Sequence, residues 1–225
     1  MQYKIHHARQ TMLALALVPA LCLPLVGCDS GSETMSRKTY DSGDTAISAI
    51  VIDVKDSAVA VAASKDDQVH IEYGETDKQR YDIAAADGTL TMRSVDNRNW
   101  SDYIGVSGSG DRTVTVSVPE NSMDSLSVAT TKQDIDVSAL SADGEISLSA
   151  NNGDIDFDSL DAGKAVRLNV KNGDIDGTLA GDYGDYTITT SIKKGDSNLP
   201  SGATNGDKTL DVTANNGDVN IQFRQ

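Results

Sequence analysis

Five aspartates recur through the second half of the chain, and their carboxylates are the side chains most able to do chemistry. The spacings are 20, 20, 22 and 22 residues, and the set is Asp134, Asp154, Asp174, Asp196 and Asp218. Ca²⁺ takes roughly six to eight oxygen ligands, which a column of carboxylates could supply. The alternative is that each aspartate caps its own turn by accepting a backbone hydrogen bond. We expect capping, because the spacing matches neither an EF-hand loop nor the nonapeptide calcium repeat.

A second candidate is the segment from Asn97 to Arg112, NRNWSDYIGVSGSGDR, which is rich in Gly and Ser. It contains the single tryptophan of the chain, Trp100, close to Tyr103. An exposed aromatic pair on a loop is a common contact for a sugar ring or a protein partner. The alternative is that Trp100 folds back as a plug over the end of the domain.

The chain offers little for catalysis. His70 is the only histidine beyond the first ten residues, so a zinc site with several histidines is excluded there. A Ser-His-Asp triad would depend wholly on His70, whose setting in QVHIEY predicts an outward strand residue. No phosphate-binding loop or dinucleotide fingerprint is present. The sequence predicts no enzyme, and a glycosidase or lyase using paired aspartates is a less favoured alternative.

The N-terminus predicts an exported lipoprotein. Residues 1–10 carry Lys4 and Arg9 without an acid, and the following apolar run is too short and too rich in proline for a spanning helix. The run ends in Leu25, Val26, Gly27 and Cys28, which resemble the site cleaved by lipoprotein signal peptidase. The prediction is a signal peptide over 1–27 and a diacylated Cys28, whose acyl chains, such as palmitate, would anchor the protein. An ordinary secretory signal cleaved nearby is the alternative.

Charge limits the possible partners. Residues 1–27 contain two basic residues and no acid, so their removal changes the net charge from −15 to −17. Such a chain repels phosphate backbones, which excludes nucleic acid as a plausible partner. Basic proteins, cationic peptides and divalent cations remain electrostatically possible.

The elements that must position these residues are strands. Residues 28–45 are polar and without apolar period, which predicts a flexible tether. Beyond it, apolar residues alternate at period two, as in AISAIVIDV and RTVTVSV, and sustained helical spacing is absent. We therefore expect an all-β domain over 46–225.

From about residue 125 the chain consists of five similar units of 20 to 22 residues, which predicts a β-solenoid whose units stack on one another. Three apolar columns run through the units: Leu126, Ile146, Val166, Ile188 and Leu210; Val128, Leu148, Leu168, Thr190 and Val212; and Ile135, Ile155, Ile175, Ser197 and Val219. The polar Thr190 and Ser197 make the fourth unit a weak coil or a bend, and VNIQF at the end predicts a closing strand. Because Asn-Gly pairs also favour hairpins, an antiparallel meander is the rival fold.

The chain resembles a bacterial β-strand-repeat family of unknown function, the putative adhesins, which are similar to auto-transporter adhesin head domains. The resemblance rests on the opening strands ISAIVIDVKDSAVAVAASKDDQVHIEY, on TVTVSVPENSMDSLSV and on the serial NGDI units, and it spans Ile47 to Phe223. The chain departs from the pattern at Gln133, where Gly is expected, and in the fourth unit. The resemblance implies a β-solenoid-like fold at the bacterial surface and brings no catalytic residues.

These observations predict a lipid-anchored protein on the extracytoplasmic side of the cell membrane, acting as a binding or adhesion module for a protein or glycan. The alternative is a structural or envelope-stress lipoprotein that binds another membrane protein. No cofactor is expected apart from the possible Ca²⁺.

Overall fold

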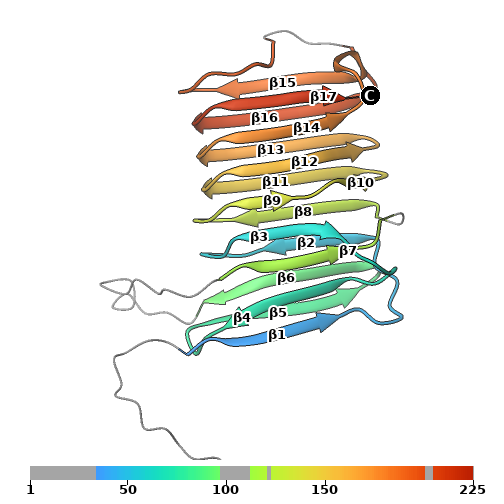
Figure 1. Ribbon diagram of the computed structural model, residues 1–225, viewed down its shortest axis with the longest axis vertical. Coiled ribbons are helices and arrows are strands. Elements are labelled where there is room, and N and C mark those ends of the chain that lie inside the picture. The colour runs from blue at the N-terminus through green and yellow to red at the C-terminus, as the bar shows by residue number, and fades with distance from the viewer. Residues whose placement is uncertain (1–33, 97–111, 121–122, 201–204, 225) are drawn as a thin grey trace, which may run out of the picture. The chain divides into compact units, whose positions relative to one another are not determined.

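The computed structural model describes residues 34–96, 112–120, 123–200 and 205–224, and almost all of its regular structure is β-strand (Figure 1). The elements are β1 (Ser36–Asp41), β2 (Ala49–Asp53), β3 (Val59–Ala63), β4 (His70–Glu75), β5 (Gln79–Ala86), β6 (Thr89–Asp96), β7 (Val114–Val118), β8 (Ser125–Thr130), β9 (Ile135–Val137), β10 (Leu140–Ala142), β11 (Glu145–Asn152), β12 (Ile155–Ala162), β13 (Ala165–Asn172), β14 (Ile175–Ala180), the 3-10 helix η2 (Tyr183–Asp185), β15 (Tyr186–Ile192), β16 (Lys208–Asn216) and β17 (Val219–Arg224). No helix in these ranges is long and apolar enough to cross a membrane.

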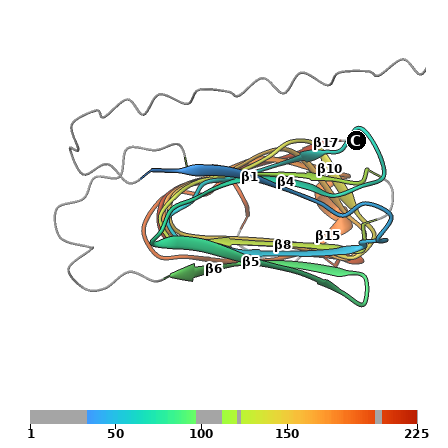
Figure 2. The ribbon, with the colours of Figure 1, turned by 90° about the horizontal axis from the view of Figure 1, so that it is seen from below.

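The strands form two sheets that face each other across one apolar interior (Figure 2). Sheet A has nine strands in the order β1-β4-β7-β3-β9-β12-β14-β17, with β10 beside β12. Sheet B has eight, in the order β15-β16-β13-β11-β8-β2-β6-β5. A coil runs along a strand of sheet B, turns, and returns along a strand of sheet A, as in β11 to β12 and β13 to β14.

Neighbouring coils pair in parallel, in the register that the sequence repeats predict. Ile146 lies opposite Leu126 and Val166, and Ile155 lies opposite Ile135 and Ile175. The β-solenoid prediction is therefore confirmed, and the antiparallel meander is wrong for the repeats. Antiparallel pairing occurs at the N-terminal end, where β4 pairs with both β1 and β7 and β5 pairs with β6.

The order of the coils in space differs from their order in the chain. The fifth unit, β16 and β17, lies between the third unit and the fourth, because β16 pairs with both β13 and β15. The coil of β6 and β7 is likewise inserted between β2 and β3 on one side and β4 and β5 on the other. The fourth unit is thus the outermost coil, where one side is free of a paired strand.

The interior is aliphatic, as the columns predict. Ile146, Val166, Leu210 and Ile155 are 0% exposed. Thr190 is half-buried and Ser197 is exposed, so these two positions of the fourth unit depart from the predicted core. The outermost coil tolerates polar residues because it has a neighbour on one side only. β17 is the predicted closing strand, with a single bridge from Ser197 to Val219 beyond it.

The turns explain the Asn-Gly pairs. Gly153, Gly173 and Gly217 have φ of 154°, 150° and 148°, a conformation that L side chains rarely adopt. A Cβ on Gly173 would also overlap the carbonyl group of Gly153 in the neighbouring coil. Glycine therefore permits both the corner and the close stacking of successive corners.

The predicted tether is shorter than expected, because β1 lies within 28–45. Its six residues, SRKTYD, are mostly exposed, so they carry no apolar period that would predict a strand. Their backbone hydrogen bonds come from antiparallel pairing with β4, from Ser36 opposite Glu75 to Asp41 opposite His70. This pairing is long-range and therefore invisible in the local sequence pattern.

Candidate functional site

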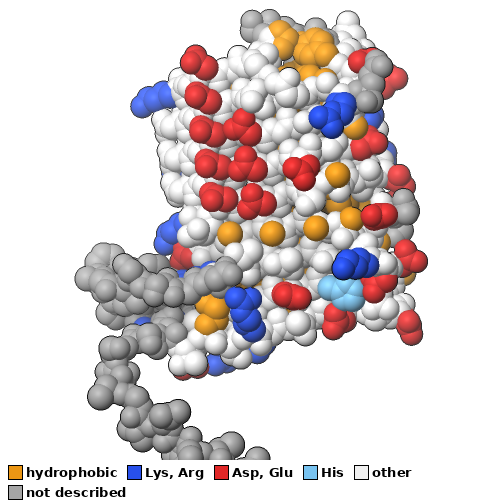
Figure 3. All heavy atoms as spheres, in the orientation of Figure 1, with side chains coloured by type: hydrophobic (Ala, Val, Ile, Leu, Met, Phe, Trp, Pro, Cys, Tyr) orange, Lys and Arg blue, Asp and Glu red, His pale blue; other side chains and the backbone are white. Residues whose placement is uncertain are grey.

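The aspartate column lies on the outer face of sheet A and at its turns, where carboxylates gather in two rows (Figure 3). In the first row four of the five carboxylates accept a hydrogen bond from the backbone N–H of the equivalent aspartate in the neighbouring coil. The donor–acceptor distances are 2.9 Å from Asp154 to Asp134, 2.8 Å from Asp174 to Asp154, 2.7 Å from Asp218 to Asp174 and 2.8 Å from Asp196 to Asp218. These four aspartates thus cap the neighbouring coil and not their own turn, which corrects the predicted geometry.

A second set of amides supports the same stack. Asn172 donates from Nδ2 to Oδ1 of Asn152 at 2.7 Å, and Asn216 donates to Asn172 at 2.6 Å. Asn152 in turn donates to the carbonyl oxygen of Thr131 at 3.1 Å. In-register asparagine ladders of this kind stabilise stacked strands, and this one links the first, second, third and fifth units of the repeat, which are adjacent in space.

The second row consists of Asp136, Asp156 and Asp176, and its negative charges receive fewer hydrogen bonds than those of the first row. Burial, and after it the neighbouring carboxylates, raises the pKa of Asp156, and the same two causes raise the pKa of Asp136. Equivalent residues of adjacent coils lie about 4.8 Å apart, where two unit charges repel by about 0.9 kcal/mol in water. In the fifth unit Asn220 stands in this row and donates to Asp176 Oδ1 at 3.0 Å.

For the first row, capping is observed, and calcium binding stays the less favoured alternative. One oxygen of four of its carboxylates already accepts a backbone hydrogen bond. Within the ranges that the structure describes, no group of three or more His, Cys, Asp or Glu residues is placed to hold a metal ion.

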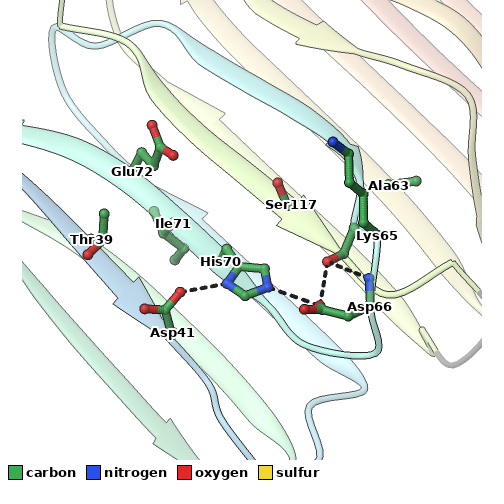
Figure 4. Close-up of a pocket in the computed structure, with 10 residues that line it drawn as sticks. Thr39, Asp41, Ala63, Lys65, Asp66, His70, Ile71, Glu72 and Ser117 are labelled. Atoms are coloured by element: carbon green, nitrogen blue, oxygen red, sulfur yellow. Dashed lines mark hydrogen bonds and ion pairs between the residues drawn. The ribbon is translucent and has the colours of Figure 1, made fainter.

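A pocket of about 400 Å³ opens on the same sheet near the N-terminal end, around His70 (Figure 4). β4 carries His70, β1 carries Asp41, β7 carries Ser117, and the loop between β3 and β4 carries Asp66. Because Asp41 and Ser117 are the cross-strand partners of His70, the sheet register alone aligns these three residues in a row.

His70 is held between two carboxylates. Its Nδ1 lies 2.5 Å from Asp41 Oδ1, and its Nε2 lies 3.0 Å from Asp66 Oδ1. The hydrogen bonds to Asp41 and then Asp66 raise the pKa of His70. The hydrogen bond from His70, together with bonds from the Ser64 hydroxyl and the Gln68 N–H, lowers the pKa of Asp66. This geometry favours an imidazolium that donates both N–H groups.

This arrangement differs from that of a hydrolase triad. A general base needs a neutral ring nitrogen directed at the serine hydroxyl, whereas Nε2 of His70 is directed at Asp66. The expectation that His70 is an outward strand residue is met, since its side chain is 34% exposed. The sequence did not identify Asp41 and Asp66 as its partners, because no local motif joins the three residues.

The other predicted sites lie outside the described residues. These are the lipidation site and its recognition residues, Leu25, Val26, Gly27 and Cys28, and the loop residues Trp100 and Tyr103. They stay predictions.

The fold defines a class, the β-solenoid domains with parallel coils. Within it, the chain belongs to the Toastrack DUF4097 family, which matches residues 47–176, and the resemblance seen in the sequence is confirmed. Comparison with curated proteins gives no match.

One of the similar solved structures shares the architecture. A putative cell adhesion protein from Clostridium sporogenes aligns with a TM-score of 0.59 at 11% identity, over 86% of this chain and 100% of that one. A putative adhesin from Bacteroides fragilis aligns at 10% identity over 86% of this chain and 98% of that one, with a TM-score of 0.37. At these identities the first likeness shows the fold alone.

Proposed function

We propose that the protein is a non-enzymatic surface module that binds another macromolecule, held at the extracytoplasmic side of a membrane through the lipid on Cys28. The observation that carries the binding role is the rigid outer face of sheet A. Its strands from β3 to β17 pair in parallel, and successive coils are linked through the carboxylate ladder and through the asparagine ladder at the ends of the sheet B strands. A face that is ordered before binding loses little conformational entropy on contact, which favours recognition of a large partner.

The chemistry of the face supports the same conclusion. Asp154, Asp156, Asp174 and Asp176 are exposed on it, so a partner with basic groups would complement its charge. The pocket on the same sheet has a histidine whose two ring nitrogens already contact carboxylates, so this histidine is not free to act as a general base. The name of one similar solved structure, a putative cell adhesion protein, is consistent with this role.

Anchoring is tested by fractionation of cells. The full chain should sediment with membranes, and Cys28→Ser should release it into the soluble extracytoplasmic fraction. A Cys28→Ser protein that stays wholly in the membrane fraction would contradict the lipid anchor without affecting the binding role.

Binding is tested by site-specific photocrosslinking on living cells. A crosslinking amino acid replaces Asp156 on sheet A in one variant and Asn169 on sheet B in the other; both side chains are exposed. We expect adducts with one defined partner from position 156 and few from position 169. Adducts with host proteins or glycans would support adhesion, whereas integral membrane proteins of the same cell would support the structural role. Equal, diffuse adducts from both positions would refute a binding face on sheet A.

A further inference from the structure

Strand β1 is weakly held. It is the outermost strand of sheet A, and among the described strands it pairs only with β4. Five of its six side chains are exposed, and only Tyr40 packs against the core. Little apolar burial therefore opposes its separation from the sheet.

Polar contacts hold the two ends of β1. At its N-terminal end, Lys38 Nζ lies 2.6 Å from Glu75 Oε2. At its C-terminal end, Asp41 contacts His70 at 2.5 Å, and His70 contacts Asp66 at 3.0 Å. Directly after the strand, the backbone N–H of Ser42 donates to Val69 at 2.9 Å, and its hydroxyl accepts from the Val69 N–H at 3.0 Å.

The contact at Asp41 depends on the protonation of His70. A charged imidazolium donates one N–H to each carboxylate, but a neutral imidazole has a single N–H. On deprotonation, one of the two carboxylates must therefore face a ring lone pair. The remaining charged groups of the pocket are Lys65, from the same loop as Asp66, and Glu72, from β4 itself.

We propose that Asp41, His70 and Asp66 form a proton-operated clasp, which holds β1 against β4 while His70 is charged and lets β1 separate from β4 when His70 is neutral. Separation would uncover the backbone N–H and C=O groups along the β4 edge. Such an edge is able to pair with another strand.

The direction of the effect follows from the raised pKa of His70. A histidine whose pKa is higher in the clasped state stabilises that state fully below its unclasped pKa, and this stabilisation is lost as the pH rises through the clasped pKa; the hydrogen bond to Asp41 is the first cause of the rise. The Lys38–Glu75 pair does not share this window, because the pKa of Lys38 is raised and, on balance, the pKa of Glu75 is lowered.

The test measures two quantities on the full chain by NMR. The first is the titration of the His70 ring, identified by its absence in His70→Gln. The second is the hydrogen-exchange protection of the β1 amides against pH, corrected for intrinsic exchange. Linkage requires the two to agree: protection of β1 should fall about tenfold for each unit by which the His70 pKa lies above its unclasped value.

Variants separate the clasp from general stability. Asp41→Asn and His70→Gln should abolish the pH dependence of β1 protection, and Asp66→Asn should reduce it and lower the His70 pKa. Glu75→Gln is the matched control, since it removes the other contact: protection should fall at every pH while the pH dependence remains. If His70→Gln fails to fold, the pH dependence of β1 protection in Asp66→Asn and in the wild type still tests the proposal. Constant β1 protection while His70 titrates, or an unchanged pH dependence in Asp41→Asn, would overturn the proposal.

Discussion

The packing of Phe157 against Gly177 gives a quantitative prediction about the core. The two residues lie opposite each other in adjacent coils, and Phe157 is 4% exposed. A Cβ on Gly177 would overlap the Phe157 ring, so the missing side chain of one coil accommodates the large side chain of the next. The two residues therefore make a volume exchange: the large side chain in one coil fills the space left by the glycine in the next.

Each single substitution should destabilise the domain. Phe157→Ala should lower the free energy of unfolding by about 3–5 kcal/mol, because it removes a buried ring and leaves a cavity. Gly177→Ala should lower it by about 1–3 kcal/mol through overpacking, less a few tenths gained from the stiffer unfolded chain. In the double variant the added methyl enters the vacated space, so its loss should be smaller than the sum by about 1 kcal/mol or more.

The assay is urea unfolding followed by circular dichroism, with the slopes compared to verify that all variants unfold to the same extent. Gly184→Ala is the control: a Cβ there meets no atom within 4 Å, and the change should stay within about 0.5 kcal/mol. Single effects that add to within about 0.5 kcal/mol would refute the volume exchange.

Three further predictions concern Tyr186 on β15 and the two carboxylate rows. Burial, and after it the carboxylates of Asp161 and Asp185, raises the pKa of Tyr186 to about 12, so the fold favours the neutral phenol and loses stability between pH 10 and about 12. Tyr186→Phe should remove part of this alkaline loss in urea melts, and should cost about 1 kcal/mol at pH 7 through the lost hydrogen bond from its hydroxyl to the Ala180 carbonyl oxygen at 2.7 Å. Because the pKa of Asp156 is raised, its charge opposes folding above that pKa. Asp156→Asn should therefore raise Tm at pH 7 more than Asp158→Asn on the same strand does. This gain should vanish below pH 3.8, where the Asp156 carboxyl group of the wild type is also neutral. An equal gain at both positions would assign the effect to net charge alone. Millimolar Ca²⁺ should leave Tm unchanged, because the first carboxylate row already accepts backbone hydrogen bonds, and a rise lost in Asp154→Asn would show a calcium site instead.

Much of the repeat domain could be predicted from the sequence. The columns through Leu126, Ile135 and their equivalents identify the register, because a shift of one residue would turn every apolar side chain outward. The Asn-Gly corners were also predictable, because a positive φ restricts the residue type.

The order of the coils was not predictable in this way. β13 pairs with β16 of the fifth unit and not with β15 of the fourth unit. Both units present similar apolar columns, so the sequence pattern alone does not distinguish the two pairings. Periodicity specifies which residues meet and not which coils are neighbours. The polar residues of the fourth unit, Thr190 and Ser197, were the one available signal, because they suit a coil with a single neighbour.

The His70 site could not be predicted either. Its partners, Asp41 and Asp66, are separated from it by 29 and four residues, and both lie in segments without apolar period. Asp41 reaches His70 only through the antiparallel pairing of β1, which depends on backbone hydrogen bonds and not on side-chain pattern.

The inserted coils have a consequence for how the chain can assemble during synthesis. A repeat protein in chain order can grow one unit at a time as the N-terminal end emerges. Here β15 emerges before β16, the strand it docks on, and β4 and β5 emerge before β6 and β7. Both ends must therefore wait, and the central coils from β8 to β14, whose neighbours follow in sequence, are the segment from which ordered structure can spread outward in both directions.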